Sequence, residues 1–218
     1  CIFNKFFSQL SNIIRLYPIM SPSNLAIQIG IHSDSGSLID SFDVGNIVSP
    51  SDKYLDININ DISKTKQIDL KKISSFSIIA NVNQGKMPTR IGHQLIYGAG
   101  GLNSSIAVSL FNPNVFSPPN KKSFKWGQAI SGGKYDSLIG IVSDPSENSN
   151  IKEHNANIKF YTKDGLLAEK NLNIKNGSAI KIEVAKELGI KTGNESLSEY
   201  IWCTLDSEHL GLNFFSTS

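Results

Sequence analysis

The sequence predicts an all-β protein built from two tandem immunoglobulin-like β-sandwich units that arose by internal duplication. Three observations favour this fold class. Short segments alternate apolar and polar residues, and turn residues recur about every 8–12 positions, as in β-sandwiches. The same order of elements then occurs twice. The chain has 218 residues, which suits two domains of about 100 residues each.

Composition and charge exclude several classes of protein. Hydrophobic residues make up 39% of the chain and charged residues 18%, which is enough apolar material for a folded core. The formal net charge of +2 is far below the basic excess of a nucleic-acid binder. No apolar run approaches the ~20 residues of a membrane span, so we expect no membrane insertion.

The N-terminal segment has its own pattern. Apolar residues between Cys1 and Leu16 recur at spacings of three and four, which predicts a short amphipathic helix, with a loose first strand as the alternative. Lys5 and Arg15 are its only cations, so we expect it to pack on the adjacent domain rather than on a membrane surface. The chain does not begin with Met, and we expect an incomplete N-terminus and leave the localisation open.

The first unit is expected over residues 1–98. Leu25, Ile27, Ile29 and Ile31 alternate strictly with polar or small residues, and Ser33–Gly36 has the composition of a turn. The segments expected as further strands are IIRLYPIM, SLIDSFDV, IVSP, YLDININ, FSIIANV and TRIGHQLIYG. Asp61–Ile73 reads as a polar connection.

The second unit is expected over residues 135–218. Asn155–Val184 reads as strand, turn, strand, turn, strand, with Lys163-Asp164-Gly165 and Asn176-Gly177 as the turns. AKELG predicts a short helical turn, and EYIWCTL and LNFFSTS predict the last strands. Cys203 lies in the first of these two and is expected to be a buried small hydrophobe, although a bridge to Cys1 is an alternative.

Residues 99–134 are expected to form an interunit segment packed between the units. It spans 36 residues rich in Gly, Pro, Asn and Ser, longer than an ordinary connection. SSIAVSLF predicts one more strand within it. Its aromatic residues, Phe116, Phe124 and Trp126, indicate that it packs against the rest of the molecule.

The internal duplication is inferred from an alignment of Gly36 with Gly165. This places Ile27, Ile29 and Ile31 opposite Ala156, Ile158 and Phe160. Later strands follow in the same order, with FSIIANV matching YIWCTLD and IGHQLIYG matching LNFFSTS. The alternative is that two β-rich segments align loosely without common descent.

A family resemblance accompanies the second unit. The relevant segments are Ala156–Tyr161, the Lys163-Asp164-Gly165 turn, Ala179–Val184, Leu188 and Tyr200–Leu205. In these the unit resembles the sensory rhodopsin transducers, which are small β-sandwich proteins. The resemblance implies a non-catalytic module that binds a partner protein or a small ligand and can form a homo-oligomer. It assigns no functional residue.

The return strand of the first unit is one candidate binding site. Strand alternation puts Arg90 and Gln94 on one face, and His93 and Tyr97 on the other. A guanidinium fork beside an amide suits a carboxylate, a phosphate or a sugar hydroxyl. The alternative is structural, with Arg90 in an ion pair and His93 bound to a backbone carbonyl. The matching segment LNFFSTS has no Arg, His or Gln.

The segment FKWGQAISGGKY is the second candidate. Trp126 beside Gly127 and Gln128 suits a sugar-stacking platform, because an exposed indole next to an amide offers an apolar face and hydrogen bonds. The alternative is that Trp126 fills the gap between the two sandwiches.

Catalytic and metal motifs are absent from the sequence. It contains no GxSxG, HExxH, P-loop or CxxC motif, and no ligand spacing predicts a metal or a cofactor. Asp144, Glu147 and Glu153 offer oxygens for calcium, but without the regular spacing of a calcium loop, so a solvated turn is favoured.

The resulting hypothesis is a non-enzymatic β-sandwich protein that binds a ligand or a partner. A glycan or other small molecule, carbohydrate or cell-envelope related, is the favoured ligand class, and no nucleic acid is expected. One alternative is a transducer-like interaction module with a protein partner. A second alternative is a hydrolase or lyase that uses Arg90, His93 and Tyr97.

Overall fold

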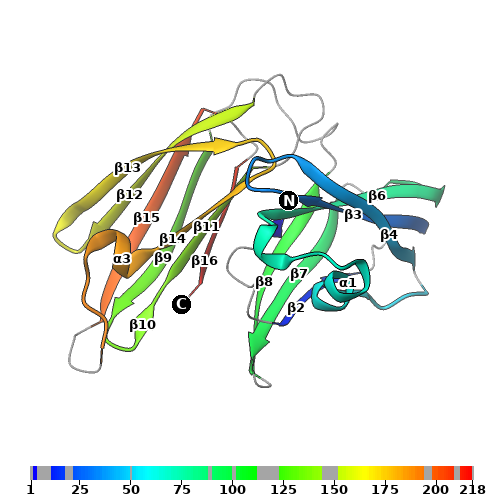
Figure 1. Ribbon diagram of the computed structural model, residues 1–218, viewed down its shortest axis with the longest axis horizontal. Coiled ribbons are helices and arrows are strands. Elements are labelled where there is room, and N and C mark those ends of the chain that lie inside the picture. The colour runs from blue at the N-terminus through cyan, green and yellow to red at the C-terminus, as the bar shows by residue number, and fades with distance from the viewer. Residues whose placement is uncertain are drawn as a thin grey trace.

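The computed structural model describes residues 2–3, 11–17, 22–49, 51–87, 90–99, 102–111, 123–143, 152–193, 198–208 and 212–217. Strands dominate these residues, so the prediction of an all-β protein is confirmed. The strands form four antiparallel sheets, two in each half of the chain (Figure 1).

The first half contains two four-stranded sheets. One has the order β1-β6-β3-β4 and the other the order β5-β2-β7-β8. The strands are β1 (Ile2–Phe3), β2 (Ser11–Leu16), β3 (Ser23–His32), β4 (Leu38–Ser49), β5 (Leu55–Asn58), β6 (Ser75–Gly85), β7 (Arg90–Ala99) and β8 (Leu102–Phe111). The helix α1 (Ile59–Lys66) and the 3-10 helix η1 (Leu70–Lys72) connect β5 to β6.

The second half contains a five-stranded sheet and a three-stranded sheet. Their orders are β10-β9-β15-β12-β13 and β14-β11-β16. The strands are β9 (Ser123–Gly132), β10 (Tyr135–Asp136), β11 (Leu138–Ser143), β12 (Glu153–Thr162), β13 (Gly165–Lys175), β14 (Ala179–Glu183), β15 (Glu199–Ser207) and β16 (Leu212–Thr217). The expected short helical turn is α3 (Val184–Leu188).

Each half buries its core between its two sheets. In the first half, Ile27 and Ile29 of β3 pack with Ile14 of β2 in one apolar cluster. In the second half, Ile158 and Phe160 of β12 pack with other strand residues in another cluster. Strict alternation of side chains across each strand produces these one-sided cores. Each half is therefore a sandwich of two sheets.

The two halves share a strand order. The set β6-β3-β4 in the first half corresponds in chain order to β15-β12-β13 in the second, and β5-β2-β7 corresponds to β14-β11-β16. A helix follows β5 and another follows β14. An immunoglobulin constant domain instead has sheets of order ABED and CFG, so the strand order here is different.

Three sequence expectations differ from the structure. Ser11–Leu16 is the strand β2, so a helix extending through this part of the N-terminal segment was wrong. The expected polar connection Asp61–Ile73 contains most of α1 and all of η1. The segment 99–134, expected between the units, contributes β8 to a first-half sheet beside β7 and β9 to a second-half sheet beside β15.

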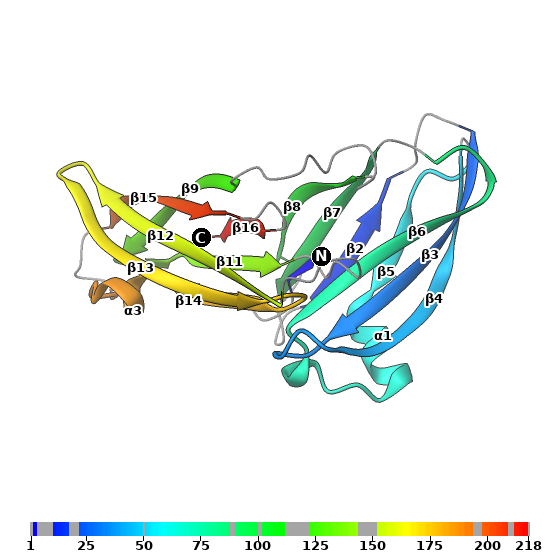
Figure 2. The same cartoon turned by 90° about the horizontal axis from the view of Figure 1, so that it is seen from above.

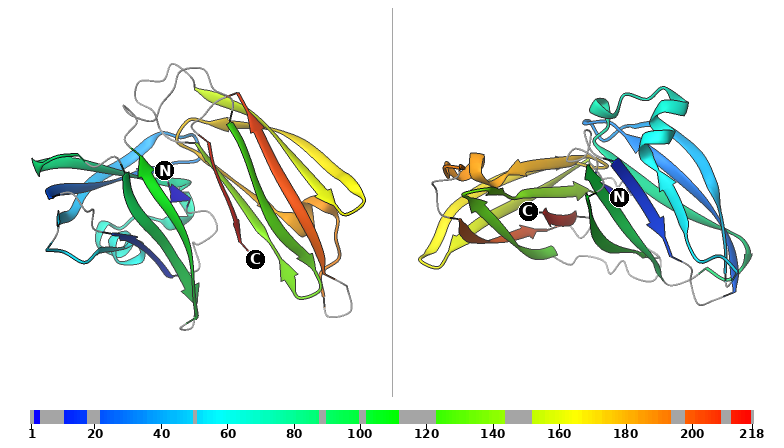
Figure 3. Two further views of the ribbon diagram at one scale, coloured as in Figure 1. Left: turned by 180° about the vertical axis from the view of Figure 1, so that it is seen from behind. Right: turned by 90° about the horizontal axis from the view of Figure 1, so that it is seen from below.

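The halves lie side by side (Figures 2 and 3). The turn at Gly36 and the start of β6 in the first half touch the turn before β14 in the second half. Ser75 Oγ donates to the backbone carbonyl of Gly177 at 2.6 Å, and Ser74 Oγ accepts from the backbone N–H of Ala179 at 2.9 Å. Val142 and Ala179 of the second half join the apolar cluster of the first. No helix among the described residues is long and apolar enough to cross a membrane.

Candidate functional site

The outer face of the five-stranded sheet carries a pair of exposed indoles. Trp126 of β9 is 62% exposed and Trp202 of β15 is 45% exposed. Their ring centroids lie 5.8 Å apart, with the planes tilted by 37°. We call Trp126 and Trp202 the aromatic platform. Such a pair is an apolar surface in contact with water, which is what a stacking site for a ligand requires.

The inner residues of β9 and β15 fix the platform's direction. Ala129 of β9, and Ile201 and Cys203 of β15, are fully buried, so their neighbours along each strand face outwards. Gly127 lies directly opposite Cys203, and a Cβ there would be 2.6 Å from Cε1 of Phe214 in β16. This glycine therefore lets β9 approach the other sheet closely.

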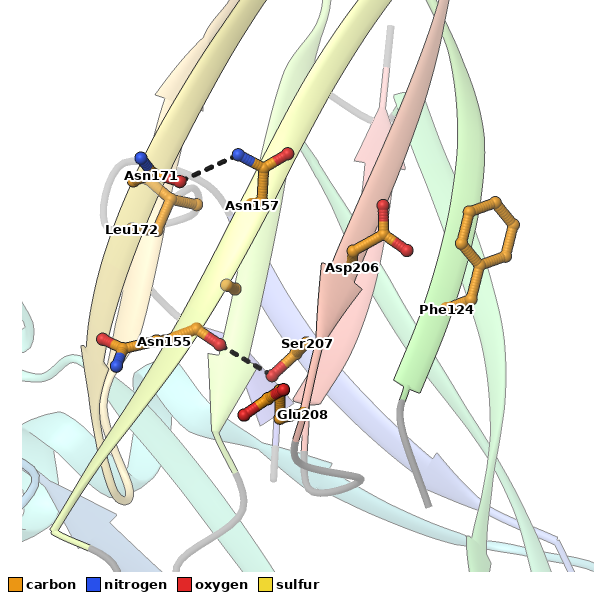
Figure 4. A pocket seen from close by; sticks show the side chains of 9 residues that line it. Phe124, Asn155, Asn157, Asn171, Leu172, Asp206, Ser207 and Glu208 are labelled. Atoms are coloured by element: carbon orange, nitrogen blue, oxygen red, sulfur yellow. Dashed lines mark hydrogen bonds between the residues drawn. The ribbon is translucent and has the colours of Figure 1, made fainter.

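A pocket adjoins the platform on the same sheet. Its side nearest the platform is a row of residues paired across four strands, in which Phe124 faces Asp206, Asp206 faces Asn157, and Asn157 faces Asn171. Figure 4 shows the pocket side chains coming from β9, β15, β12 and β13, with Glu208 just beyond β15. The described residues that line it are Phe124, Asn155, Ala156, Asn157, Asn171, Leu172, Asp206, Ser207 and Glu208. We call this the amide pocket.

Hydrogen bonds hold the amides of the pocket in place. Asn157 Nδ2 donates to Asn171 Oδ1 and to Glu169 Oε1, both at 2.8 Å. Asn157 Oδ1 is buried and has no hydrogen-bond partner among the described residues. A buried acceptor without a partner is costly unless a ligand or water supplies a donor. The pocket therefore presents a preorganised acceptor beside the carboxylate of Asp206.

Two residues predicted from the sequence lie on this face. Trp126 does not fill a gap between the halves, because most of its side chain is exposed. Gln128 of β9 is exposed and lies directly opposite Trp202. Its backbone carbonyl accepts a hydrogen bond from Ser216 Oγ. The structure thus brings Trp126 and Gln128 together with Trp202 on this face.

Of the candidate residues of β7, His93 does not lie at the surface. Ile91, His93 and Leu95 are buried, as the alternation predicts, and His93 is only 3% exposed. Burial lowers the pKa of His93 to about 4. A ring enclosed in the core cannot contact a surface ligand. The sequence prediction that His93 contacts a surface ligand was therefore wrong.

Gln94 is partly buried and faces the other side of β7, where its Oε1 accepts a 2.5 Å hydrogen bond from the Tyr17 hydroxyl. The side chains of Arg90 and Tyr97 lie outside the described part of the structure.

A charged cluster near Gln94 is satisfied internally. Arg15 donates from Nε and one terminal nitrogen to the two carboxylate oxygens of Asp56, both at 2.7 Å. Its guanidinium lies 4.2 Å from the ring centroid of Tyr54. The ion pair raises the pKa of Arg15 and lowers the pKa of Asp56. These contacts make a structural pair across β2 and β5.

Sequence reasoning missed Trp202, Asp206, Asn157 and Asn171. The signal for Trp202 was available, because the alternation of EYIWCTL puts Trp202 on the face opposite Cys203. The cross-strand partners were not readable, because they depend on the pairing of β9 with β15 and of β12 with both neighbours.

The described residues offer neither a metal site nor an exposed thiol. Among the described residues, no group of three or more His, Cys, Asp or Glu side chains is placed to hold a metal ion. Asp144 and Glu147, considered for calcium, lie outside the described residues, and Glu153 accepts a hydrogen bond from Asn173 at 2.9 Å. Cys203 is free and buried, and burial raises the pKa of its thiol to about 12.

Comparison with known proteins gives no relative: no family model, no curated protein and no solved structure matches this chain.

Proposed function

We propose that this protein binds carbohydrate without catalysis, through the aromatic platform and the amide pocket. The observation that carries the proposal is the pair of exposed indoles, Trp126 and Trp202, with centroids 5.8 Å apart beside a pocket lined with amides. A glycan has apolar ring faces that stack on indoles and hydroxyl groups that need donors and acceptors. The sheet offers both kinds of contact on one face.

The rigidity of the face supports the proposal. The platform and the pocket are built on paired strands rather than loops, so their side chains lose little further freedom when a ligand binds. Asn157 is already fixed by two hydrogen bonds from its Nδ2. A preorganised flat surface suits a chain-like ligand that lies along the face.

Glycan-array screening followed by calorimetric titration tests the proposal. The Trp126→Ala and Trp202→Ala variants should each weaken binding at least about tenfold, which is ~1.4 kcal/mol. Tyr54→Ala is the matched control, because Tyr54 is an exposed aromatic residue of the other half, and it should leave the affinity unchanged. Full affinity in both tryptophan variants, or no bound glycan on a broad array, would reject the proposal.

A protein partner on the same face is the alternative, in line with the resemblance to sensory rhodopsin transducers. Aromatic residues are enriched at protein interfaces, and Leu166 and Leu167 are also exposed on β13, the edge strand of the same sheet. Light scattering distinguishes the two. A symmetric oligomer that Trp202→Ala dissociates favours the interaction module, whereas a monomer that binds glycan favours the carbohydrate reading.

We also propose that the two halves descend from one duplicated sandwich unit. The matching strand sets and the helix after β5 and β14 support common descent. The residues before the two helices, Asn58 and Glu183, have nearly the same backbone angles, with φ of −86° and −85° and ψ of 107° at both. The shared unit is a sandwich with its own strand order rather than an immunoglobulin domain.

A further inference from the structure

We infer that the amide pocket selects its sugar by charge: it accepts an uncharged or amino-bearing unit and rejects a unit that carries a carboxylate. The inference rests on the proposed carbohydrate binding and names the ligand class within it. It depends on Asp206, a carboxylate among the described residues that line the pocket. None of the described lining residues is cationic.

Asp206 occupies the position that decides the selectivity. It lies between Phe124 on β9 and Asn157 on β12, in the cross-strand row on the side of the pocket nearest the platform. Its side chain is exposed and has no hydrogen-bond or ion-pair partner among the described residues. A sugar carboxylate placed here would meet a like charge that no cation among the described lining residues offsets. Like charges at a binding surface are a common means of excluding the wrong ligand.

Neutral hydroxyl groups fit the same position. The Asp206 carboxylate accepts hydrogen bonds from hydroxyls, and the partnerless Asn157 Oδ1 is a second acceptor close by. Phe124 flanks them with an apolar ring that is 59% exposed. Two acceptors beside an aromatic ring suit a sugar with adjacent hydroxyls, and an ammonium group on the sugar would donate to the same acceptors.

On the outer face of the sheet, Lys159 is the cation nearest to the Asp206 row in the strand register, and its place does not reverse this selectivity. It lies one row closer to the platform, between Thr204 of β15 and Glu169 of β13. The carboxylate residue Glu169 stands directly opposite it. Lys159 is not among the residues that line the pocket. An acidic sugar at the pocket therefore faces Asp206 first.

The geometry also implies a ligand of at least two sugar units. Phe124 of the pocket and Trp126 of the platform are two residues apart on β9, which is about 7 Å along a strand. One ring stacked on the platform therefore has its neighbour beside the pocket. Charge selectivity should appear at that neighbouring unit and not at the stacked one.

The test uses the whole chain and pairs of oligosaccharides of equal length and linkage, one neutral and one in which the hexose is replaced by its uronic acid. Galacto-oligosaccharides with the matching oligogalacturonides, and gluco-oligosaccharides with the matching glucuronides, provide such pairs. The pair containing the tightest neutral ligand is titrated. We expect the unaltered protein to prefer the neutral member at least about tenfold. Asp206→Asn should reduce this preference to about threefold or less, mainly because it binds the uronide more tightly.

Asp164→Asn is the control, because Asp164 is an exposed acid in the β12–β13 turn, and it should keep the full preference. Equal affinity of the unaltered protein for both members of the pair overturns the inference. So does an unchanged preference in Asp206→Asn. In both cases the proposed function stands if Trp126→Ala weakens binding at least about tenfold. Failure of every oligosaccharide to bind instead rejects the proposed function itself.

Discussion

His93 is the residue at which sequence pattern and structural role diverge most. A polar residue on a return strand suggested a ligand contact, but its ring lies in the first core, between the buried neighbours Ile91 and Leu95. Its Nδ1 has no partner among the described residues. Burial without a charged partner disfavours the imidazolium, which is why the pKa of His93 falls to about 4.

The low pKa of His93 predicts a loss of stability in mild acid. The folded state binds this proton with a pKa of about 4, whereas an unfolded chain binds it near 6.5. The contribution of His93 to the free energy of unfolding is therefore complete above pH 6.5. It is lost as the pH falls from 6.5 through 4, and the loss reaches up to ~3 kcal/mol. Urea unfolding at pH 7.5, 5.5 and 4.5 measures the effect.

His93→Leu should flatten this dependence, because a leucine of similar size has no proton to bind. His32, whose pKa is also lowered by burial, keeps part of the slope in that variant. The same acid sensitivity in His93→Leu as in the unaltered protein would contradict the assignment.

At the residue level the sequence predicts which side chains are buried better than which ones meet. The alternation in β3 and β12 correctly marks their core residues, because burial follows from a local period of two. The alternation did not decide whether Trp126 is exposed or fills a gap between the halves, because the direction of a side chain in β9 depends on which sheet the strand joins. Trp202 and Asp206 reach their partners only through pairings between strands distant in the chain.

At the level of elements, hairpins were predictable and α1 was not. Gly165 has φ of +117° in the β12–β13 turn and Gly177 has φ of +77°, so the glycine signals marked real turns. YLDININ alternates like a strand to its end, yet β5 stops at Asn58 and a helix begins. The cause is local: Asn58 Oδ1 accepts from the backbone N–H groups of Asn60 and Asp61.

Removal of this cap should destabilise the first half. Asn58→Ala leaves two N–H groups of the first helical turn without their side-chain acceptor, and we expect a loss of ~1 kcal/mol in the free energy of unfolding. Asn58→Asp keeps the acceptor and should retain most of the stability. Urea denaturation followed by circular dichroism measures both variants. Equal losses in Asn58→Ala and Asn58→Asp would show that the side-chain cap is not the cause.

For the whole molecule, the order of strands was predictable but their distribution among sheets was not. SSIAVSLF in segment 99–134 is a strand as expected, yet its place beside β7 comes from pairing rather than composition. The docking of the halves also depends on contacts far apart in sequence. Ser75 Oγ bonds to the carbonyl of Gly177, and the turn at Gly36 lies against the turn at Asn176.

Gly36 is the residue through which this docking can be tested. It has φ of +82°, and a Cβ at this position would lie 1.8 Å from the backbone oxygen of Asn176 in the other half. Backbone atoms cannot rotate away as a side chain can, so Gly36→Ala must push the two turns apart. Gly165→Ala is the matched control, because Gly165 also has positive φ but nothing lies within 4 Å of its would-be Cβ.

Both alanine variants should lose about 1–2 kcal/mol through the left-handed backbone alone. Only Gly36→Ala should also increase the radius of gyration measured by small-angle X-ray scattering, and broaden thermal unfolding, because halves that no longer dock unfold less cooperatively. Ser75→Ala removes the hydroxyl that donates to Gly177. As a single substitution it should also broaden thermal unfolding. It should add little in the double variant with Gly36→Ala, in which the turns are already separated. Equal scattering profiles for Gly36→Ala and Gly165→Ala would mean that the halves are held by other contacts.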